Sequence, residues 1–259
     1  MTTHRTIDVN CDLGEGRTPG ERHLETQLMD IVTSVNVACG VHAGSAAVMR
    51  QTVRLAHARG LAIGAHPGLA DREHKGRREQ ALSPDFAREL VAAQVSDLLA
   101  ICRTEGARLT HVKPHGALYN MAAGDPALAD AVAAGIAQIG PQLVLIGLAG
   151  SQLLRAGRAA AGVTVAAEGF ADRAYRPDGQ LVARHLAGAL IEEETAVVSR
   201  ARSLILHGTI QAIDGSLLQM HIDTLCLHSD TAGAVRLAFA LRKMLKQEGI
   251  TVQRLPHAG

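Results

Sequence analysis

The chain has 259 residues, of which 47% are hydrophobic, and this suits one large α/β domain with a sizeable core. Only 2% of the residues are aromatic and the formal net charge is +1, so neither base stacking nor electrostatic attraction favours a nucleic-acid or anionic-membrane partner. No stretch has the length of a membrane span, and no apolar signal region precedes the first strand-like run, so we expect a cytoplasmic protein.

Strand-like and helix-like runs alternate along the chain. We predict strands at 7–11, 34–39, 61–65, 109–113, 143–148, 164–168 and 223–227, and helices at 22–31, 46–59, 84–105, 126–138, 151–160, 192–206 and 231–248. Ser83-Pro84 is typical of a helix N-cap followed by proline in the first turn. Asp214-Gly215 predicts a hairpin turn, so a small hairpin insertion is expected near 208–221.

The alternation of strands and helices predicts the fold class. Consecutive units of this kind form parallel sheets through right-handed crossovers. About seven units predict a distorted α/β barrel, a (β/α) barrel that occupies residues 1–259 as one domain. The rival arrangement is an open, doubly wound sheet.

Polar residues share one face of the first three predicted strands. Successive side chains of a strand point to opposite faces, so Asp8, Asn10 and Asp12 lie on one face and the apolar residues on the other. The second strand places Asn36 on such a face, with His42 a little beyond it, and the third strand places His66 there. Since the outer face of a barrel packs against helices, these polar side chains are predicted to point inward.

The fourth and seventh strands continue this pattern. His111, Lys113 and His115 share one parity, and Pro114 biases Lys113 toward extended backbone at the strand end. The end of the seventh strand adds the inward set Cys226, His228 and Asp230. Unpaired buried charges are unfavourable, so several such groups indicate a functional site at the carboxyl ends of the strands. Asp8 and His111 lie deeper and are predicted to be structural.

Other candidates lie in loops. Gly14-Glu15-Gly16 and the segment 147–151 follow strands and offer backbone N–H groups to an anion, although neither has P-loop spacing. Arg77 is a candidate for binding a carboxylate or phosphate, and the pair Asp172-Arg173 follows the sixth strand. No two of the four cysteines form a C-x-x-C pair, so we expect buried free thiols.

These motifs resemble those of the LamB/YcsF family. The matching segments are 12–16, 36–44, 64–67, 111–120, 147–151, 168–175 and 226–230, in order along nearly the whole chain. The resemblance implies a distorted barrel similar to the glycoside hydrolase/deacetylase superfamily. It also implies ATP-dependent cleavage of 5-oxoproline (pyroglutamate) to L-glutamate, with Mg²⁺ and with partner subunits B and C. Val41, Lys75 and Ser229 depart from the family pattern beside motif residues.

Roles for the candidate residues follow from this resemblance. We expect Lys113 and Arg77 to hold anionic groups, Asp12 or Glu15 to act as general base or metal ligand, and histidines to move protons. The expected catalytic set is Asp12, Glu15, His42, His66, Lys113 and His115. The expected substrate- or phosphate-binding set is Asn10, Asn36, Arg77, Asp172, Arg173, His228 and Asp230.

Two alternative functions remain open at the level of the sequence. One is a metal-dependent, deacetylase-like hydrolase that acts alone on amide bonds. Its metal would be held by Asp12, His42 and His66, which are residue types that bind divalent cations. The other is a non-catalytic binding or scaffolding subunit.

Overall fold

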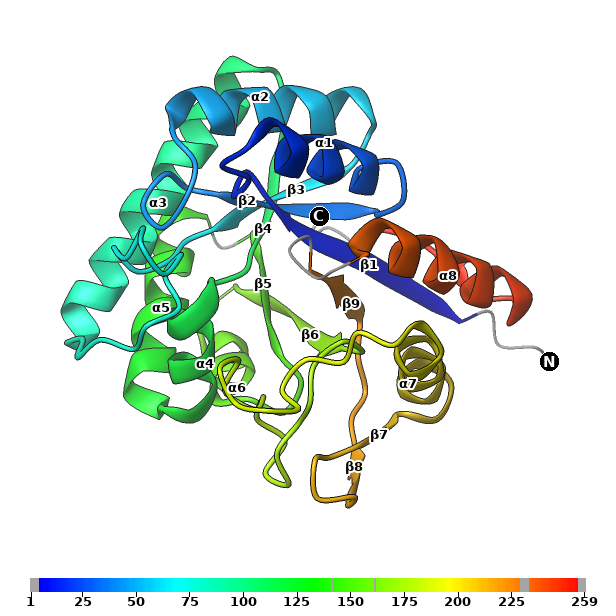
Figure 1. Ribbon diagram of the computed structural model, residues 1–259. Helices are drawn as coiled ribbons and strands as arrows, with labels where there is room; N and C mark the ends of the chain where they lie inside the picture. Colours follow the sequence, from blue (N-terminus) through cyan, green and yellow to red (C-terminus); the bar gives the residue numbers. More distant parts are fainter. Residues whose placement is uncertain (1–4, 141, 161, 229–232, 256–259) are drawn as a thin grey trace.

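The computed structural model describes residues 5–140, 142–160, 162–228 and 233–255, and its parallel strands close into a barrel (Figure 1). The barrel strands are β1 (Thr6–Leu13), β2 (Ser34–Ala38), β3 (Ala62–His66), β4 (Leu109–Val112), β5 (Val144–Leu148), β6 (Thr164–Phe170) and β9 (Thr224–Leu227). They pair in this order, and β9 pairs back onto β1, while β10 (Thr251–Val252) pairs with the start of β1. The closed barrel confirms the predicted fold class and rules out the open sheet.

Helices surround the strands (Figure 1). They are α1 (Pro19–Leu28), α2 (Ala46–Ala58), α3 (Pro84–Thr104), α4 (Gly116–Gly124), α5 (Pro126–Ile139), α6 (Gln152–Ala159), α7 (Glu194–His207) and α8 (Ala234–Gln247). Within the described ranges, none of these helices is long and apolar enough to cross a membrane. All four cysteines are buried free thiols, as expected.

Capping residues explain where several helices begin. Ser83 accepts a hydrogen bond from the backbone N–H of Phe86 and precedes Pro84, which confirms the predicted start of α3. Helix α1 begins three residues earlier than predicted, because Thr18 and Glu21 form a capping box.

Helix α4 was not predicted. It has nine residues and follows directly after the His-Lys-His segment that ends β4. Its buried residues are Ala117, Leu118, Tyr119, Ala122 and Ala123, so its sequence shows no polar stripe to mark a helical period. The helix matters for function because it begins at the mouth of the barrel.

The predicted hairpin is present as β7 (Thr209–Gln211) and β8 (Leu217–Gln219), which pair antiparallel. Gly215 adopts a φ of 89°, a left-handed conformation that favours glycine in such a turn. The backbone N–H of Ile213 donates to the carbonyl oxygen of Tyr175, so the hairpin contacts the long segment between β6 and α7.

A polar hydrogen-bond network fills the barrel interior, as the alternation of side chains predicted. The side-chain N–H₂ group of Asn36 donates to Asn10 Oδ1 (2.8 Å) and to Asp12 Oδ1 (2.9 Å). Asn10 in turn donates to Glu168 Oε1 at 3.0 Å, and His111 Nε2 lies 2.9 Å from Asn36 Oδ1. The network joins strands distant in sequence and fixes the carboxylates above it.

Gly64 on β3 makes room for the His111 ring. A Cβ atom at this position would lie 2.1 Å from ring atoms of His111. We therefore expect Gly64→Ala to lower the free energy of unfolding by about 1–3 kcal/mol, the usual range for overpacking a core. Urea unfolding measures the change. Gly20→Ala is the control, because its Cβ would meet nothing closer than 4.0 Å; equal stability of the two variants would contradict the prediction.

Candidate active site

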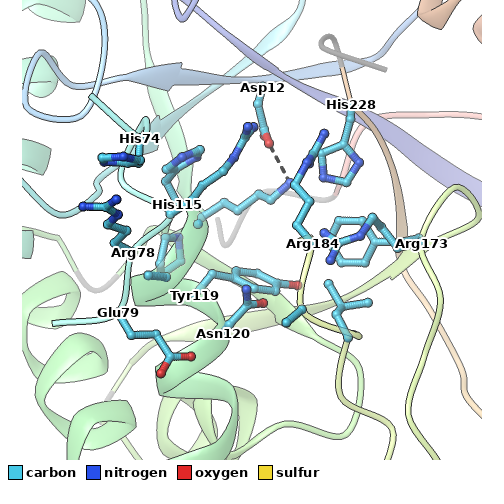
Figure 2. Close-up of a pocket in the computed structure, with 18 of the residues that line it drawn as sticks. Asp12, His74, Arg78, Glu79, His115, Tyr119, Asn120, Arg173, Arg184 and His228 are labelled. Carbon is cyan, nitrogen blue, oxygen red and sulfur yellow. Dashed lines mark hydrogen bonds and ion pairs between the residues drawn. The ribbon is translucent and has the colours of Figure 1, made fainter. Parts of the chain in front are cut away.

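A cavity of about 900 Å³ opens at the carboxyl ends of the barrel strands. Its floor includes Asp12, His66, Lys113, His115 and His228, from the ends of four strands. Its walls include Tyr119 and Asn120 of α4, residues 77–79 of the loop after β3, and residues of the segment after β6 (Figure 2). This is the end of a (β/α) barrel at which active sites occur.

Lys113 lies at the centre of the floor, with only 3% of its side chain exposed. Its Nζ lies 2.8 Å from Glu168 Oε1, 3.1 Å from Asp12 Oδ1 and 3.1 Å from Cys226 Sγ. Burial lowers the pKa of Lys113, but the attraction of Asp12 and other nearby groups outweighs burial and holds the pKa well above its ordinary value. The ammonium is therefore committed to protein acceptors, which differs from our expectation that Lys113 holds an anion of the substrate.

Asp12 connects the Lys113 network to a cluster of histidines. Its Oδ1 atom accepts hydrogen bonds from Lys113 and Asn36, whereas its Oδ2 atom lies 3.3 Å from His66 Nε2. Burial raises the pKa of Asp12, but His66 and Lys113 outweigh it and keep the pKa well below the usual range. The group is thus an ionised carboxylate with one oxygen directed toward the histidines.

Three histidines and Glu15 meet beside Asp12. His115 Nδ1 lies 2.9 Å from His66 Nε2 and 3.1 Å from Glu15 Oε1. His42 stacks on His115 with ring centroids 4.0 Å apart, and its Nε2 lies 3.2 Å from Glu15 Oε1. Burial lowers the pKa of both His42 and His115, so these rings are neutral at physiological pH.

Backbone carbonyl groups orient two of these rings. His66 Nδ1 lies 2.7 Å from the carbonyl oxygen of Lys113, and His115 Nε2 lies 2.7 Å from that of Lys75. Lys75 has a positive φ of 52°, unusual for a residue other than glycine. The family departure at Lys75 thus leaves its backbone contact with His115 in place.

Three groups of side chains in the described ranges have ligand atoms within 4.8 Å of one another and are therefore able to hold a metal. They are Asp12, His66 and His115; Glu15, His42 and His115; and Asp12, Cys226 and His228. The expected trio of Asp12, His42 and His66 is not among these three groups. The reason is that His42 turns its Nε2 toward Glu15, while Asp12 faces His66.

The glycine-containing loop at 14–16 binds an anion, but the anion belongs to the protein. The Glu25 carboxylate of α1 accepts backbone N–H groups of Gly14 (3.2 Å), Glu15 (2.9 Å) and Gly16 (2.8 Å). These donors are therefore not available to a substrate, contrary to one expectation from the sequence. Glu25 instead fixes the backbone that carries Glu15 into the histidine cluster.

The loop at 147–151 has a structural function as well. Ser151 accepts the backbone N–H of Leu154 and caps α6, while the N–H of Ala149 donates to the Glu168 carbonyl oxygen. The N–H of Ser151 likewise donates to the Leu148 carbonyl oxygen, so the loop's donors serve the fold and give no evidence of an anion site.

Arginines line the cavity wall. Arg77, Arg78, Arg173 and Arg184 all contribute, and Arg173 and Arg184 lie together on one side in Figure 2. Arg173 is buried and donates to the carbonyl oxygens of Val182 (2.7 Å) and Ala189 (3.4 Å). Burial and the nearby Arg184 cation lower the pKa of Arg173. The cations are crowded, and a bound anion would relieve their repulsion.

The structure brings most predicted site residues to the cavity or directly beneath it. Asn10 and Asn36 lie in the supporting network, and Asp172 holds His228 through a 2.8 Å contact with its Nδ1. Asp230 and Ser229 lie outside the described residues. His185 is exposed, lies in a turn and lines the cavity.

Sequence reasoning missed Glu168, Tyr119 and Glu25. Glu168 accepts from Lys113 and from the Tyr119 hydroxyl, at 2.8 Å each. A charged residue near the end of the apolar sixth strand was the available signal for Glu168. Nothing local marks Glu25, because its partners are backbone groups about ten residues away.

The fold and the site together define a (β/α) barrel with a polar pocket at its carboxyl end. A family 4 carbohydrate esterase from Streptomyces lividans has the same kind of fold, with 9% identity and a TM-score of 0.52 over 97% of this chain and 93% of that one. The model of the LamB/YcsF family matches residues 7–258, and the chain belongs to that family.

Named relatives are similar over almost their full length. The A subunit of 5-oxoprolinase from Methylococcus capsulatus is 50% identical, with 97% of this chain and 96% of the relative covered. The crystal structure of a lactam utilization protein from Thermus thermophilus matches with a TM-score of 0.87 and 38% identity, covering 96% of this chain and all of that one. These names indicate a component of a hydrolytic enzyme.

Glu25 offers a test of how the site is held. Glu25→Ala leaves three backbone donors without an acceptor, two of them buried and that of Gly16 partly buried, so we expect a loss of about 1–3 kcal/mol in unfolding free energy for each donor that water does not reach. Glu25→Gln keeps one acceptor oxygen and should lose less. Urea unfolding of both variants measures the order, and equal losses would contradict the role assigned to the carboxylate.

Proposed function

We propose that this chain is the component that opens the lactam ring of 5-oxoproline within an ATP-dependent 5-oxoprolinase. The cavity carries the proposal: it combines an ionised carboxylate and the neutral His115 ring on its floor with arginines on its wall. The names of the relatives support this substrate, since several are called A subunits of 5-oxoprolinase and one solved structure is called a lactam utilization protein.

The chemistry of the substrate explains why both polarities are needed. 5-Oxoproline carries a carboxylate next to the ring nitrogen, and its five-membered amide is unstrained and resists hydrolysis. Arg77 and Arg173 are placed to bind an anionic group, either this carboxylate or a phosphoryl group on the amide oxygen. Water then attacks the carbonyl carbon, the C–N bond breaks, and the nitrogen takes a proton to become the amine of glutamate.

Residues of the floor would manage the protons of this reaction. Asp12, which lines the cavity, is the candidate to accept a proton from the attacking water, and the neutral His115 ring is suited to pass a proton on to Glu15 beside it. Lys113 keeps Asp12 in place rather than contacting the substrate.

ATP with Mg²⁺ would phosphorylate the amide oxygen and so make the carbonyl carbon more electrophilic. Cleavage of the C–N bond then leaves an acyl phosphate, which a second water molecule cleaves to glutamate and inorganic phosphate. The sequence contains no P-loop spacing, so we propose that phosphoryl transfer depends on partner subunits B and C. The relatives are named as A subunits, which supports an assembly of several chains.

The direct test is an assay of the chain mixed with its proposed partner subunits. We expect glutamate and ADP to form from 5-oxoproline and Mg²⁺-ATP, and Asp12→Asn to lower the rate at least about 100-fold, as for loss of general acid–base catalysis. Absence of glutamate from the complete mixture would refute the function. Full activity of an assembled Asp12→Asn complex would show a binding role instead.

Arg77 allows a separate test of anion binding. Removing a charge-assisted hydrogen bond costs about 1.5–3 kcal/mol, so Arg77→Ala should raise the KM for 5-oxoproline by about 10- to 150-fold. Arg88→Ala is the matched control, because Arg88 pairs with Asp85 on the surface of α3. An unchanged KM in Arg77→Ala would remove this arginine from the binding site.

A second candidate function is a metal-dependent hydrolase that cleaves amide bonds without partners or ATP. The grouping of Asp12, His66 and His115 within 4.8 Å favours it, because this is a ligand set for a divalent cation. The isolated chain, supplied with Zn²⁺ or Mn²⁺, would then hydrolyse N-acetylated or cyclic amides, and EDTA would abolish the activity. Turnover that strictly requires ATP and partner subunits would reject this candidate.

A further inference from the structure

We propose that Asp12, His66 and His115 form a divalent-cation site on the cavity floor, with the Glu15 carboxylate beside it and His42 outside the ligand set. The inference uses the pocket of the proposed function, and in that sense rests on it. Cation binding can nevertheless be measured without ring opening, so the two ideas fail separately.

Backbone contacts determine which ring nitrogens of His66 and His115 carry hydrogen. A backbone carbonyl oxygen only accepts hydrogen bonds, so the nitrogen that contacts it must be an N–H. His66 Nδ1 contacts the Lys113 carbonyl and His115 Nε2 contacts the Lys75 carbonyl, both at 2.7 Å. The opposite nitrogens, His66 Nε2 and His115 Nδ1, are therefore the ones placed to bind a cation, which would take the position of any proton between them. Metal-binding histidines in proteins are oriented in the same way.

These two nitrogens converge with one oxygen of Asp12. His66 Nε2 and His115 Nδ1 lie 2.9 Å apart, and Asp12 Oδ2 lies 3.3 Å from His66 Nε2. Two acceptor nitrogens at this separation repel each other unless a positive charge lies between them. Ligands about 2.0–2.2 Å from one cation, at angles of roughly 90–110°, are themselves about 3.0–3.5 Å apart. Two of the three separations therefore already match those around a shared cation, and the third is within 4.8 Å.

Asp12 would bind the cation through one carboxylate oxygen. Its Oδ1 accepts from Lys113 and Asn36, which fixes the carboxylate and leaves Oδ2 facing the histidines. Glu15 Oε1 lies 3.1 Å from His115 Nδ1, so a second carboxylate stands next to the same position. Two negative charges and two lone pairs around one point favour a divalent cation.

The group of Asp12, Cys226 and His228 is excluded by Lys113. The Lys113 ammonium lies 3.1 Å from both Asp12 Oδ1 and Cys226 Sγ. It therefore occupies the position that a metal would take between these two ligands, and its own charge would repel a cation there.

The surroundings of His42 Nδ1 argue against a metal held by Glu15, His42 and His115. His42 Nδ1 is buried without a hydrogen-bond partner among the described residues, and a Cβ on Gly68 would lie only 2.5 Å from it. An unpaired N–H at this place would be costly, so Nδ1 is the bare nitrogen and Nε2 carries the hydrogen donated to Glu15. A ring in this tautomer has no lone pair to offer at Nε2.

The remaining group faces the cavity. Asp12, His66 and His115 line it, whereas Glu15 and His42 are not among the described residues that do so. A cation held by the three would keep its open coordination position toward the substrate. Bound there, it would polarise a carbonyl oxygen and activate water.

The test measures cation binding by the purified chain freed of metal with chelator. Titration with Co²⁺, followed by visible absorption, and with Zn²⁺, followed by calorimetry, should each show one site per chain. His66→Ala and His115→Ala should weaken binding more than about 100-fold, since even loss of a supporting partner costs 10- to 100-fold. Asp12→Asn, which has nearly the same shape, should do the same and guards against misfolding of the histidine variants.

His42→Gln separates this site from its alternatives, because glutamine keeps an N–H donor for Glu15 and should retain one site with affinity within about 10-fold of the wild type. His74→Gln, a cavity histidine outside the cluster, is the control. No stoichiometric binding by the wild type would overturn the proposal and leave a shared proton between the histidines. Binding unaffected in folded Asp12→Asn, or lost in folded His42→Gln, would overturn it as well.

Discussion

The Lys113 ammonium is the charge around which the barrel interior is organised. A buried cation is tolerated only when carboxylates and hydrogen-bond acceptors compensate for its lost hydration. Asp12 from β1 and Glu168 from β6 supply two carboxylates, and Cys226 from β9 supplies a third contact. One side chain on β4 thus links strands from around the barrel. It also determines which oxygen of Asp12 remains directed at the histidines.

The pairing of Lys113 with carboxylates also makes the floor of the cavity different in charge from its wall. Lys113 is neutralised within the floor, so the acceptor atoms of Asp12, His66 and His115 dominate there. On the wall, Arg173 donates to backbone carbonyls of the segment after β6, which hold the guanidinium in place without cancelling its charge. A ligand with an anionic group at one end and a polarisable carbonyl at the other matches this separation of charge.

Strand periodicity made much of this arrangement predictable. The inward parity of Asp12, His66, Lys113 and His115 follows from alternation alone, and parallel strands bring their carboxyl ends together. The barrel class followed from the number of strand–helix units. What alternation does not contain is the identity of partners across the barrel. Lys113 seemed suited to a substrate anion because its pairing with Glu168, 55 residues further along the chain, has no local signature.

Loop geometry was the other limit on prediction, and it determines the ligand set. Glycines after a strand indicate exposed N–H groups but not which carboxylate they meet; Glu25 of the protein itself takes that place. The tautomers of His66 and His115 depend on carbonyl groups of Lys113 and Lys75, which no side-chain pattern encodes. His42 belongs to a family motif as clearly as His66 does, yet its Nδ1 packs against Gly68 with no partner in the described ranges, which directs its hydrogen to Glu15. Residues of the same type in neighbouring motifs thus acquire different chemistry from the backbone around them.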